Sequence, residues 1–87
     1  MDKKAVLKKL REFIITELMQ NPDYDLKEGE KLFSNGVLDS FAIAQIGVFV
    51  ETDFDLYIPD AELTVENMDT VGMMADSVIA GLEAQED

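Results

Sequence analysis

At the centre of the sequence stands Gly36-Val37-Leu38-Asp39-Ser40-Phe41, followed at once by an apolar run that is typical of a helix. A glycine permits a sharp backbone turn, and the two aliphatic residues can anchor a loop to a core. Asp39 and Ser40 favour a helix start, because short side-chain oxygens accept from N–H groups that lack an intrahelical partner. A helix cap is therefore the simplest interpretation. An oxygen at this place could also carry a phosphate, since free N–H groups and the helix dipole favour an anion.

The composition indicates one small domain, residues 1–87, with 47% hydrophobic residues, as in globular chains. Such a domain can form one core but not a buried catalytic cleft with its own walls. The absence of cysteine and histidine excludes disulfides, thiolate metal sites and the commonest general base. No apolar run approaches a membrane span of about 20 residues, and the N-terminus lacks a signal-peptide pattern, which predicts no membrane insertion and a cytoplasmic location.

The net charge of −12 is distributed unevenly along the chain. All 7 basic residues lie in residues 1–31, where as many acids balance them, so residues 32–87 carry the whole net charge. Such a field repels nucleic acid and anionic lipid, and it attracts basic protein surfaces or divalent cations. A solvated acidic face without a partner is an equally simple interpretation.

Helical periodicity dominates the first half of the chain. Apolar residues at helical spacing predict a helix over about residues 2–20, ended by Asn21 and Pro22. A long connection, residues 21–39, follows, and Leu26, Leu32 and Phe33 could attach it to the core. The next helix is expected over about residues 40–54, with a buried stripe at Ile43, Ile46, Phe49 or Val50, and Phe54.

The second half is predicted to be helical as well. Short helical turns are expected over about residues 60–68, with Thr64 as a cap. The last helix, about residues 69–83, has a regular stripe that consists of Val71, Met74, Ala75, Val78, Ile79 and Leu82. No segment shows a strand pattern. The prediction is an all-α fold, a small up-down bundle of four helices, of which three are long and one is short.

The central stretch resembles the prosthetic-group site of the acyl carrier proteins, whose Asp-Ser-Leu motif receives 4′-phosphopantetheine on its serine. Phe41 replaces the leucine of that motif. The resemblance continues in the long loop before the serine, in Phe54 leading to the Ile58-Pro59-Asp60 turn, and in the pair Thr70-Val71. It covers about residues 32–82 and implies an acyl-carrier-like fold.

The resemblance implies that Ser40 accepts phosphopantetheine from coenzyme A, in a reaction catalysed by a magnesium-dependent phosphopantetheinyl transferase. The thiol of this arm would then carry an acyl group as a thioester between acyl-transfer, ligase or synthase enzymes with basic docking surfaces. The carrier itself, expected to be a monomer, would catalyse nothing. The cargo could belong to a fatty-acid or polyketide pathway, or it could be an amino acid such as D-alanine.

The resemblance also implies that partner enzymes recognise the helix that follows Ser40 through apolar contacts surrounded by carboxylates. The positions expected to contact partners are Asp39, Phe41, Ala44, Val48, Glu51, Asp55, Ile58 and Asp60. Ile58 corresponds to the apolar residue beside the prosthetic arm. The first three turns of this helix hold no carboxylate, which departs from the strongly acidic carriers of fatty-acid synthesis.

An unmodified acidic adaptor or a cation-binding module is the alternative from another class of protein. The aspartates after residue 52 suggest a calcium loop, but an EF-hand starting at Asp53 would need an oxygen ligand, a glycine and a glutamate where Tyr57, Ile58 and Thr64 stand. The sequence therefore predicts no metal site of this type. Intact mass after treatment with a transferase and coenzyme A would distinguish a carrier from an unmodified adaptor.

Overall fold

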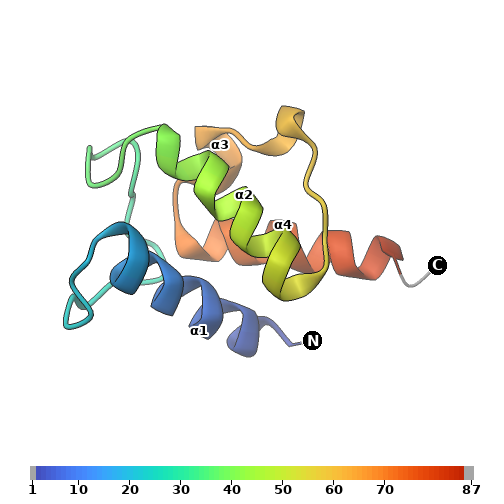
Figure 1. Cartoon of the computed structure of the whole chain (residues 1–87), viewed down its shortest axis with the longest axis horizontal. Helices are drawn as coiled ribbons and strands as arrows, with labels where there is room; N and C mark the ends of the chain where they lie inside the picture. Colours follow the sequence, from blue (N-terminus) through green and yellow to red (C-terminus); the bar gives the residue numbers. More distant parts are fainter. Residues whose placement is uncertain (1, 86–87) are drawn as a thin grey trace.

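Helices account for all the regular secondary structure in residues 2–85, the part of the chain that the computed structural model describes. This confirms the all-α prediction. The elements, in order, are α1 (Lys3–Phe13), the π-helical turn η1 (Ile14–Leu18), α2 (Phe41–Phe54), the 3₁₀ turn η2 (Asp60–Glu62), α3 (Val65–Met68) and α4 (Val71–Gln85), as Figure 1 shows. The molecule measures 37 × 25 × 21 Å.

The first helix ends in a turn that its sequence did not predict. Asp2 caps α1 by accepting a hydrogen bond from the backbone N–H of Ala5 at 2.9 Å. At the other end, the N–H of Met19 donates to the carbonyl of Ile14 at 2.8 Å, which is the i+5 pattern of a π-helix. The extra residue in this turn changes the helical register. As a result both Ile14 and Ile15 are buried.

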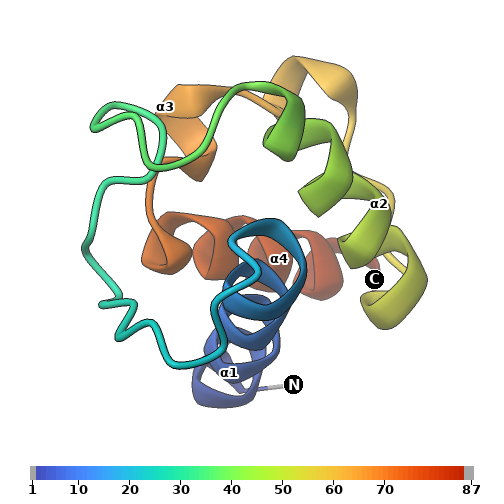
Figure 2. The ribbon, with the colours of Figure 1, turned by 60° about the vertical axis from the view of Figure 1, so that its left-hand side comes forward.

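The three long helices enclose one core. Figure 1 and Figure 2 show α1 and α4 lying side by side, with α2 crossing above them. The residues that they contribute to the core cluster are Val6 and Leu10 of α1, Ile46, Val50 and Phe54 of α2, and Val71, Met74, Ala75 and Val78 of α4. In Figure 1, α1 runs in one direction and both α2 and α4 run in the other, so the long helices do not simply alternate as in an up-down bundle. The reason is that residues 55–70 lead the chain back to the side where α2 begins.

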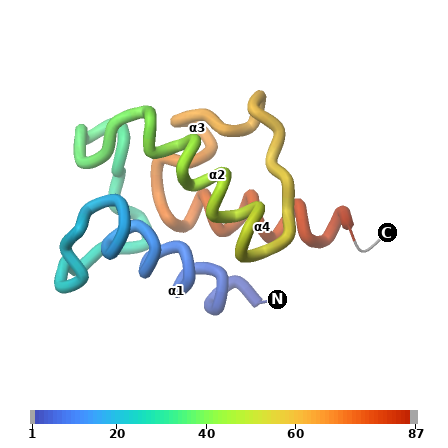
Figure 3. Tube along the Cα trace, viewed as in Figure 1, coloured from blue at the N-terminus to red at the C-terminus, as the bar shows by residue number. Residues whose placement is uncertain are grey.

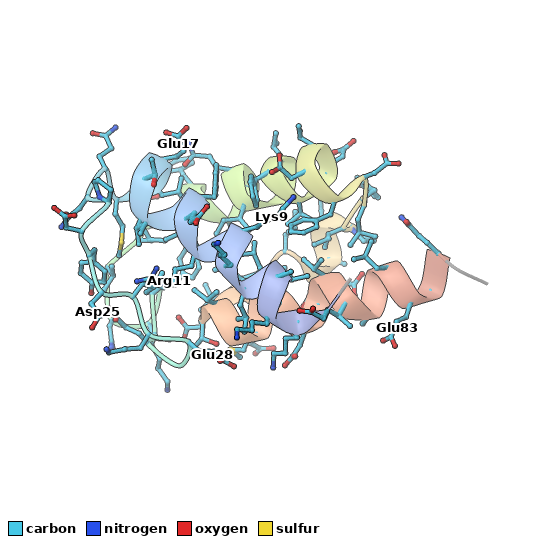
Figure 4. All side chains as sticks on the ribbon, turned by 90° about the horizontal axis from the view of Figure 1, so that it is seen from below. Lys9, Arg11, Glu17, Asp25, Glu28 and Glu83 are labelled. Atoms are coloured by element: carbon cyan, nitrogen blue, oxygen red, sulfur yellow. The ribbon has the colours of Figure 1, made fainter. Side chains whose placement is uncertain are left out.

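The connection between η1 and α2, which we call the first loop (residues 19–40), is attached to the core as predicted. Leu26 and Leu32 are buried and Phe33 is half-buried. The Nε of Arg11 donates to the carbonyl of Leu26 at 3.0 Å, and its Nη2 lies 3.9 Å from Oδ1 of Asp25. Figure 4 shows Arg11 of α1 reaching toward this part of the loop.

The connection between α2 and α3, which we call the second loop (residues 55–64), alternates between buried and exposed side chains. It begins at Asp55, which ends α2 in the left-handed conformation at a φ of 53°. Leu56 and Ile58 are buried, and Tyr57 between them is exposed. This alternation is what an extended backbone produces, because successive side chains point to opposite sides. Figure 3 shows the loop rising beside the end of α2 and returning toward α3.

Candidate functional site

Ser40 stands at the start of α2 with its hydroxyl group available. The residue is exposed, and its side chain makes no capping hydrogen bond. Asp39 supplies the cap: its Oδ1 accepts from the N–H of Phe41 at 3.0 Å, and its carbonyl accepts from the N–H of Ala42 at 3.0 Å. The two residues thus divide their roles, because Asp39 caps the helix and leaves Ser40 Oγ without a role in the cap.

A groove of about 210 Å³ lies beside α2, and its lining begins at Ala44, one helical turn after Ser40. Its lining contains five of the positions predicted to contact partners, Ala44, Val48, Glu51, Ile58 and Asp60, together with Gly47, Tyr57 and Leu63. Ser40 lies one helical turn before Ala44 and two before Gly47, so these residues share one face of α2. A group attached to the Ser40 oxygen would therefore start one helical turn before the groove, on the same face of α2.

Leu63 of the second loop lies against α2 at Gly47. A Cβ atom at position 47 would stand 3.0 Å from Cδ1 of Leu63, so the glycine allows the two segments to approach closely. In the folded protein it lets the side chain of Leu63 form the wall of the groove opposite α2.

Three large apolar side chains around the groove are exposed to solvent. Phe41 is 81% exposed, and Val48 and Tyr57 are each 64% exposed. Phe41 and Val48 lie two turns apart on the outer face of α2, as the helical spacing predicted. Exposed apolar residues next to a groove, with Glu51 and Asp60 in its lining, form a surface that combines apolar contact area with negative charge.

Three predicted positions lie outside the lining of the groove, and one of them is the exposed Phe41. Asp39 lines a separate cleft of about 340 Å³ between η1 and the first loop, together with Glu17, Leu18, Gln20, Val37, Leu38, Ala42 and Gln45. Asp55 is exposed at the end of α2, where its carbonyl accepts from Nε2 of Gln85 at 3.4 Å. The structure therefore brings together five of the eight predicted partner positions in the groove lining, and it places Asp39, Phe41 and Asp55 outside that lining.

Ile58 differs from the expectation of a surface contact. It is only 7% exposed and belongs to the hydrophobic core, although its edge lines the groove. The physical reason is the alternation in the second loop, which turns Leu56 and Ile58 inward and Tyr57 outward. The sequence interpretation missed Tyr57 as a surface residue. The alternation of Phe54, Leu56 and Ile58 with more exposed residues was the signal that could have revealed it.

The acidic residues do not form a cluster of the kind that binds metal ions. Within residues 2–85, no three carboxylates come together in a way that could hold a cation. None of the helices in this part of the chain combines the length and apolarity needed to cross a bilayer.

Comparison with known proteins gives no relative for this chain. A scan against models of protein families found no match, and a search of curated proteins found none either. The features that bear on function are therefore the geometry of Ser40 and the groove, together with the resemblance of the sequence motifs to those of acyl carrier proteins.

Proposed function

We propose that this protein is an acyl carrier protein, which holds its cargo on a 4′-phosphopantetheine arm attached to Ser40. The single observation that supports this most strongly is an exposed serine at the start of α2, whose side chain is free of the helix cap, one helical turn before Ala44 of the groove lining. The groove lies on the same face of α2 as Ser40, where the arm would begin. The acyl-carrier-like bundle is part of this proposal.

The residues around Ser40 fit a phosphate ester. Because the helix begins at this point, its dipole favours a negative charge. The N–H groups of Phe41 and Ala42 already donate to Asp39, and that of Ile43 donates to the carbonyl of Ser40. Because Oδ1 of Asp39 accepts from the N–H of Phe41, the serine oxygen is not needed as a cap. It remains exposed and can reach the active site of another enzyme. When bound, the group would supply the thiol that this chain lacks, since the sequence contains no cysteine.

In the attachment step, one bond to phosphorus would form and another would break. Ser40 Oγ would form a bond to the phosphorus that carries pantetheine in coenzyme A, and the phosphorus would lose its bond to the nucleotide-bearing oxygen. The nucleotide half, a 3′,5′-bisphosphate of adenosine, would leave. The serine proton would pass to a base of the transferase, because the chain has no histidine that could accept it.

The surface around the groove indicates how partner enzymes would dock. Phe41, Val48 and Tyr57 offer apolar contact area, while Glu51 and Asp60 offer charge at the groove. Apolar contacts that exclude water contribute most of the affinity in such interfaces, and peripheral charges mainly direct the encounter. Partner enzymes with an apolar patch inside a basic rim would complement this surface.

The test is intact mass after incubation with a broad-specificity phosphopantetheinyl transferase, magnesium and coenzyme A. The wild type should gain one phosphopantetheinyl group, and Ser40→Ala should gain none. Ser77→Ala, which changes a half-buried serine of α4, is the matched control and should gain one group. A wild type that remains unmodified by several different transferases would contradict the proposal and favour an unmodified acidic adaptor.

A further inference from the structure

Asp69, at the junction of α3 and α4, holds a segment of the first loop that lies 35 residues earlier in the chain. Its side chain is buried, with the residue only 7% exposed. Oδ1 accepts from the N–H of Phe33 at 2.9 Å and from the N–H of Ser34 at 3.0 Å, and Oδ2 accepts from the hydroxyl of Ser34. The carbonyl of Asp69 accepts from the N–H of Leu32 at 2.7 Å. One residue thus receives hydrogen bonds from three consecutive residues of the loop.

The segment that Asp69 holds is itself closed by hydrogen bonds and leads directly to Ser40. The N–H of Leu38 donates to the carbonyl of Leu32 at 2.9 Å, and the N–H of Gly36 donates to the carbonyl of Phe33 at 3.1 Å. Gly36 has a φ of 75°, a conformation that a side chain would strain. Figure 2 shows this closed part of the first loop lying beside α3 before the chain enters α2. Ser40 is only two residues beyond Leu38.

The carboxylate of Asp69 is well suited to accept the hydrogen bonds from this segment. Three donors, two backbone N–H groups and one hydroxyl, converge on its two oxygens, and an ionised carboxylate accepts such bonds most strongly. The hydroxyl of Ser34 and the N–H groups of Ser34 and Phe33 hold the pKa of Asp69 below its ordinary value of 3.8, so the group is ionised at neutral pH. If the side chain left this position, two partly buried N–H groups would lose their acceptor.

We propose that Asp69 is a positioning residue for the modification of Ser40: it fixes residues 32–34, and through the closed segment it fixes the place of the Ser40 oxygen. This inference rests on the proposed carrier function. Asp69 does not need to touch the transferase or coenzyme A. It acts by restricting the positions that the Ser40 hydroxyl can take when the docked enzyme approaches, which lowers the entropy cost of reaching the reactive geometry.

The kinetic experiment compares phosphopantetheinylation of the wild type with that of Asp69→Ala, Ser34→Ala and Asp76→Asn. Asp76 is an exposed carboxylate of α4, whose Oδ1 lies 3.0 Å from Nζ of Lys3, and its variant is the control. All variants are assayed at a temperature at which circular dichroism shows them folded. We expect kcat to fall about tenfold in Asp69→Ala, by less in Ser34→Ala, and not at all in Asp76→Asn. KM should change little, because the apolar docking residues of α2 are unaltered.

Amide hydrogen exchange of the apo proteins tests the positioning without any transferase. In Asp69→Ala the amides of Leu38 and Phe41 should exchange at least several-fold faster, while that of Val78 in the core of α4 should not. Equal exchange at Leu38 and Phe41 in the two proteins, or an unchanged kcat, would overturn the inference. If Asp69→Ala does not fold, Ser34→Ala, which removes the hydroxyl that donates to Oδ2, provides the comparison, with a smaller change expected in both measurements.

The two proposals fail in different ways. If the wild type accepts no phosphopantetheine, the carrier function is wrong, and the exchange data alone then decide whether Asp69 fixes the Ser40 segment. If the wild type is modified and Asp69→Ala is modified at the same rate, the carrier function stands and the positioning role of Asp69 is wrong.

Discussion

The first loop and the second loop lie at opposite ends of α2, and they are held in different ways. The first loop makes hydrogen bonds to distant elements. Asp69 accepts hydrogen bonds from residues 32–34, and the carbonyl of Glu28 accepts from the N–H of Gly72 at 3.1 Å. The second loop receives a long-range hydrogen bond at its first residue, where Nε2 of Gln85 donates to the carbonyl of Asp55 at 3.4 Å. Its backbone–backbone hydrogen bonds are short-range, as from the N–H of Leu63 to the carbonyl of Asp60 at 3.1 Å. Its attachment to the core depends on the buried side chains of Leu56 and Ile58.

This difference matters because hydrogen bonds are directional and apolar contacts are not. The first loop delivers Ser40 to one defined place, as the attachment of a prosthetic group would require. The second loop provides the wall of the groove opposite α2, formed by Tyr57, Ile58, Asp60 and Leu63. Under the proposed carrier function, the first loop would therefore fix the attachment point, and the second loop would form part of the surface beside it.

The largest effect should come from removing the apolar anchor of the first loop. Leu32 is fully buried, so Leu32→Ala should reduce the free energy of unfolding by about 2–5 kcal/mol. Leu63 of the second loop is only half-buried, and Leu63→Ala should cost less than about 2 kcal/mol. Urea denaturation followed by circular dichroism measures both values. An equal or larger loss in Leu63→Ala would mean that the second loop is as firmly fixed as the first.

The same contrast explains which parts of the fold could be predicted from the sequence. The buried stripe of α2 and the anchors of the first loop were predicted correctly, because helical periodicity and local apolar pattern are properties of neighbouring residues. The sequence signalled neither the π-helical turn that buries Ile15 nor the common direction of α2 and α4. Both depend on tertiary packing, which overrides local propensity.

The candidate site was predictable to a similar degree. Asp39 as a helix cap followed from the residue type, and helical spacing placed Ala44 and Val48 on one face. The role of Asp69 could not be foreseen, because its hydrogen bonds join residues that are 35 positions apart in the chain. Ile58 was assigned to the surface by resemblance, whereas the alternating backbone of the second loop buries it.

Substitutions with an intermediate effect should distinguish docking through the apolar side chains of α2 from docking through the charge of Glu51. Val48→Asp introduces a charge among the apolar contacts, and we expect it to reduce kcat/KM for modification about tenfold, which equals about 1.4 kcal/mol. Phe41→Ala should act in the same direction, since Phe41 offers the most exposed apolar side chain beside Ser40. Glu51→Lys should have a smaller effect at physiological salt and should slow association mainly at low salt.

These transfer assays need folded variants, which circular dichroism verifies, and a series of salt concentrations. Should Glu51→Lys abolish modification while Val48→Asp leaves it intact, docking would be electrostatic and the apolar surface around the groove would have another role. Ser77→Ala serves again as the control, because it leaves both the apolar surface and the charges unchanged.

The smallest effect concerns how the hydrogen bonds of Asp69 depend on pH. Asp69→Asn keeps the size of the side chain and one acceptor oxygen but removes the charge. Because the hydroxyl of Ser34 and the nearby N–H groups lower the pKa of Asp69 in the folded state, the ionised group stabilises the fold above the unfolded pKa of about 3.8. That contribution is lost as the pH falls through the lower folded pKa. The Tm of the wild type should therefore exceed that of Asp69→Asn at pH 6, and the gap should narrow steadily below pH 4.

Thermal melts of both proteins between pH 2.5 and pH 7, on the order of one pH unit apart, measure this gap. The difference between two Tm values isolates Asp69, because other titrating groups are present in both proteins. Asp25, whose pKa is also lowered, chiefly by its hydrogen bond from Lys27, cancels in this way, as does the mutual repulsion of the other carboxylates in residues 32–87. A gap that stays constant down to pH 2.5 would show that the charge of Asp69 does not stabilise the first loop. The hydrogen bonds of its neutral form would then suffice to hold Ser40 in place.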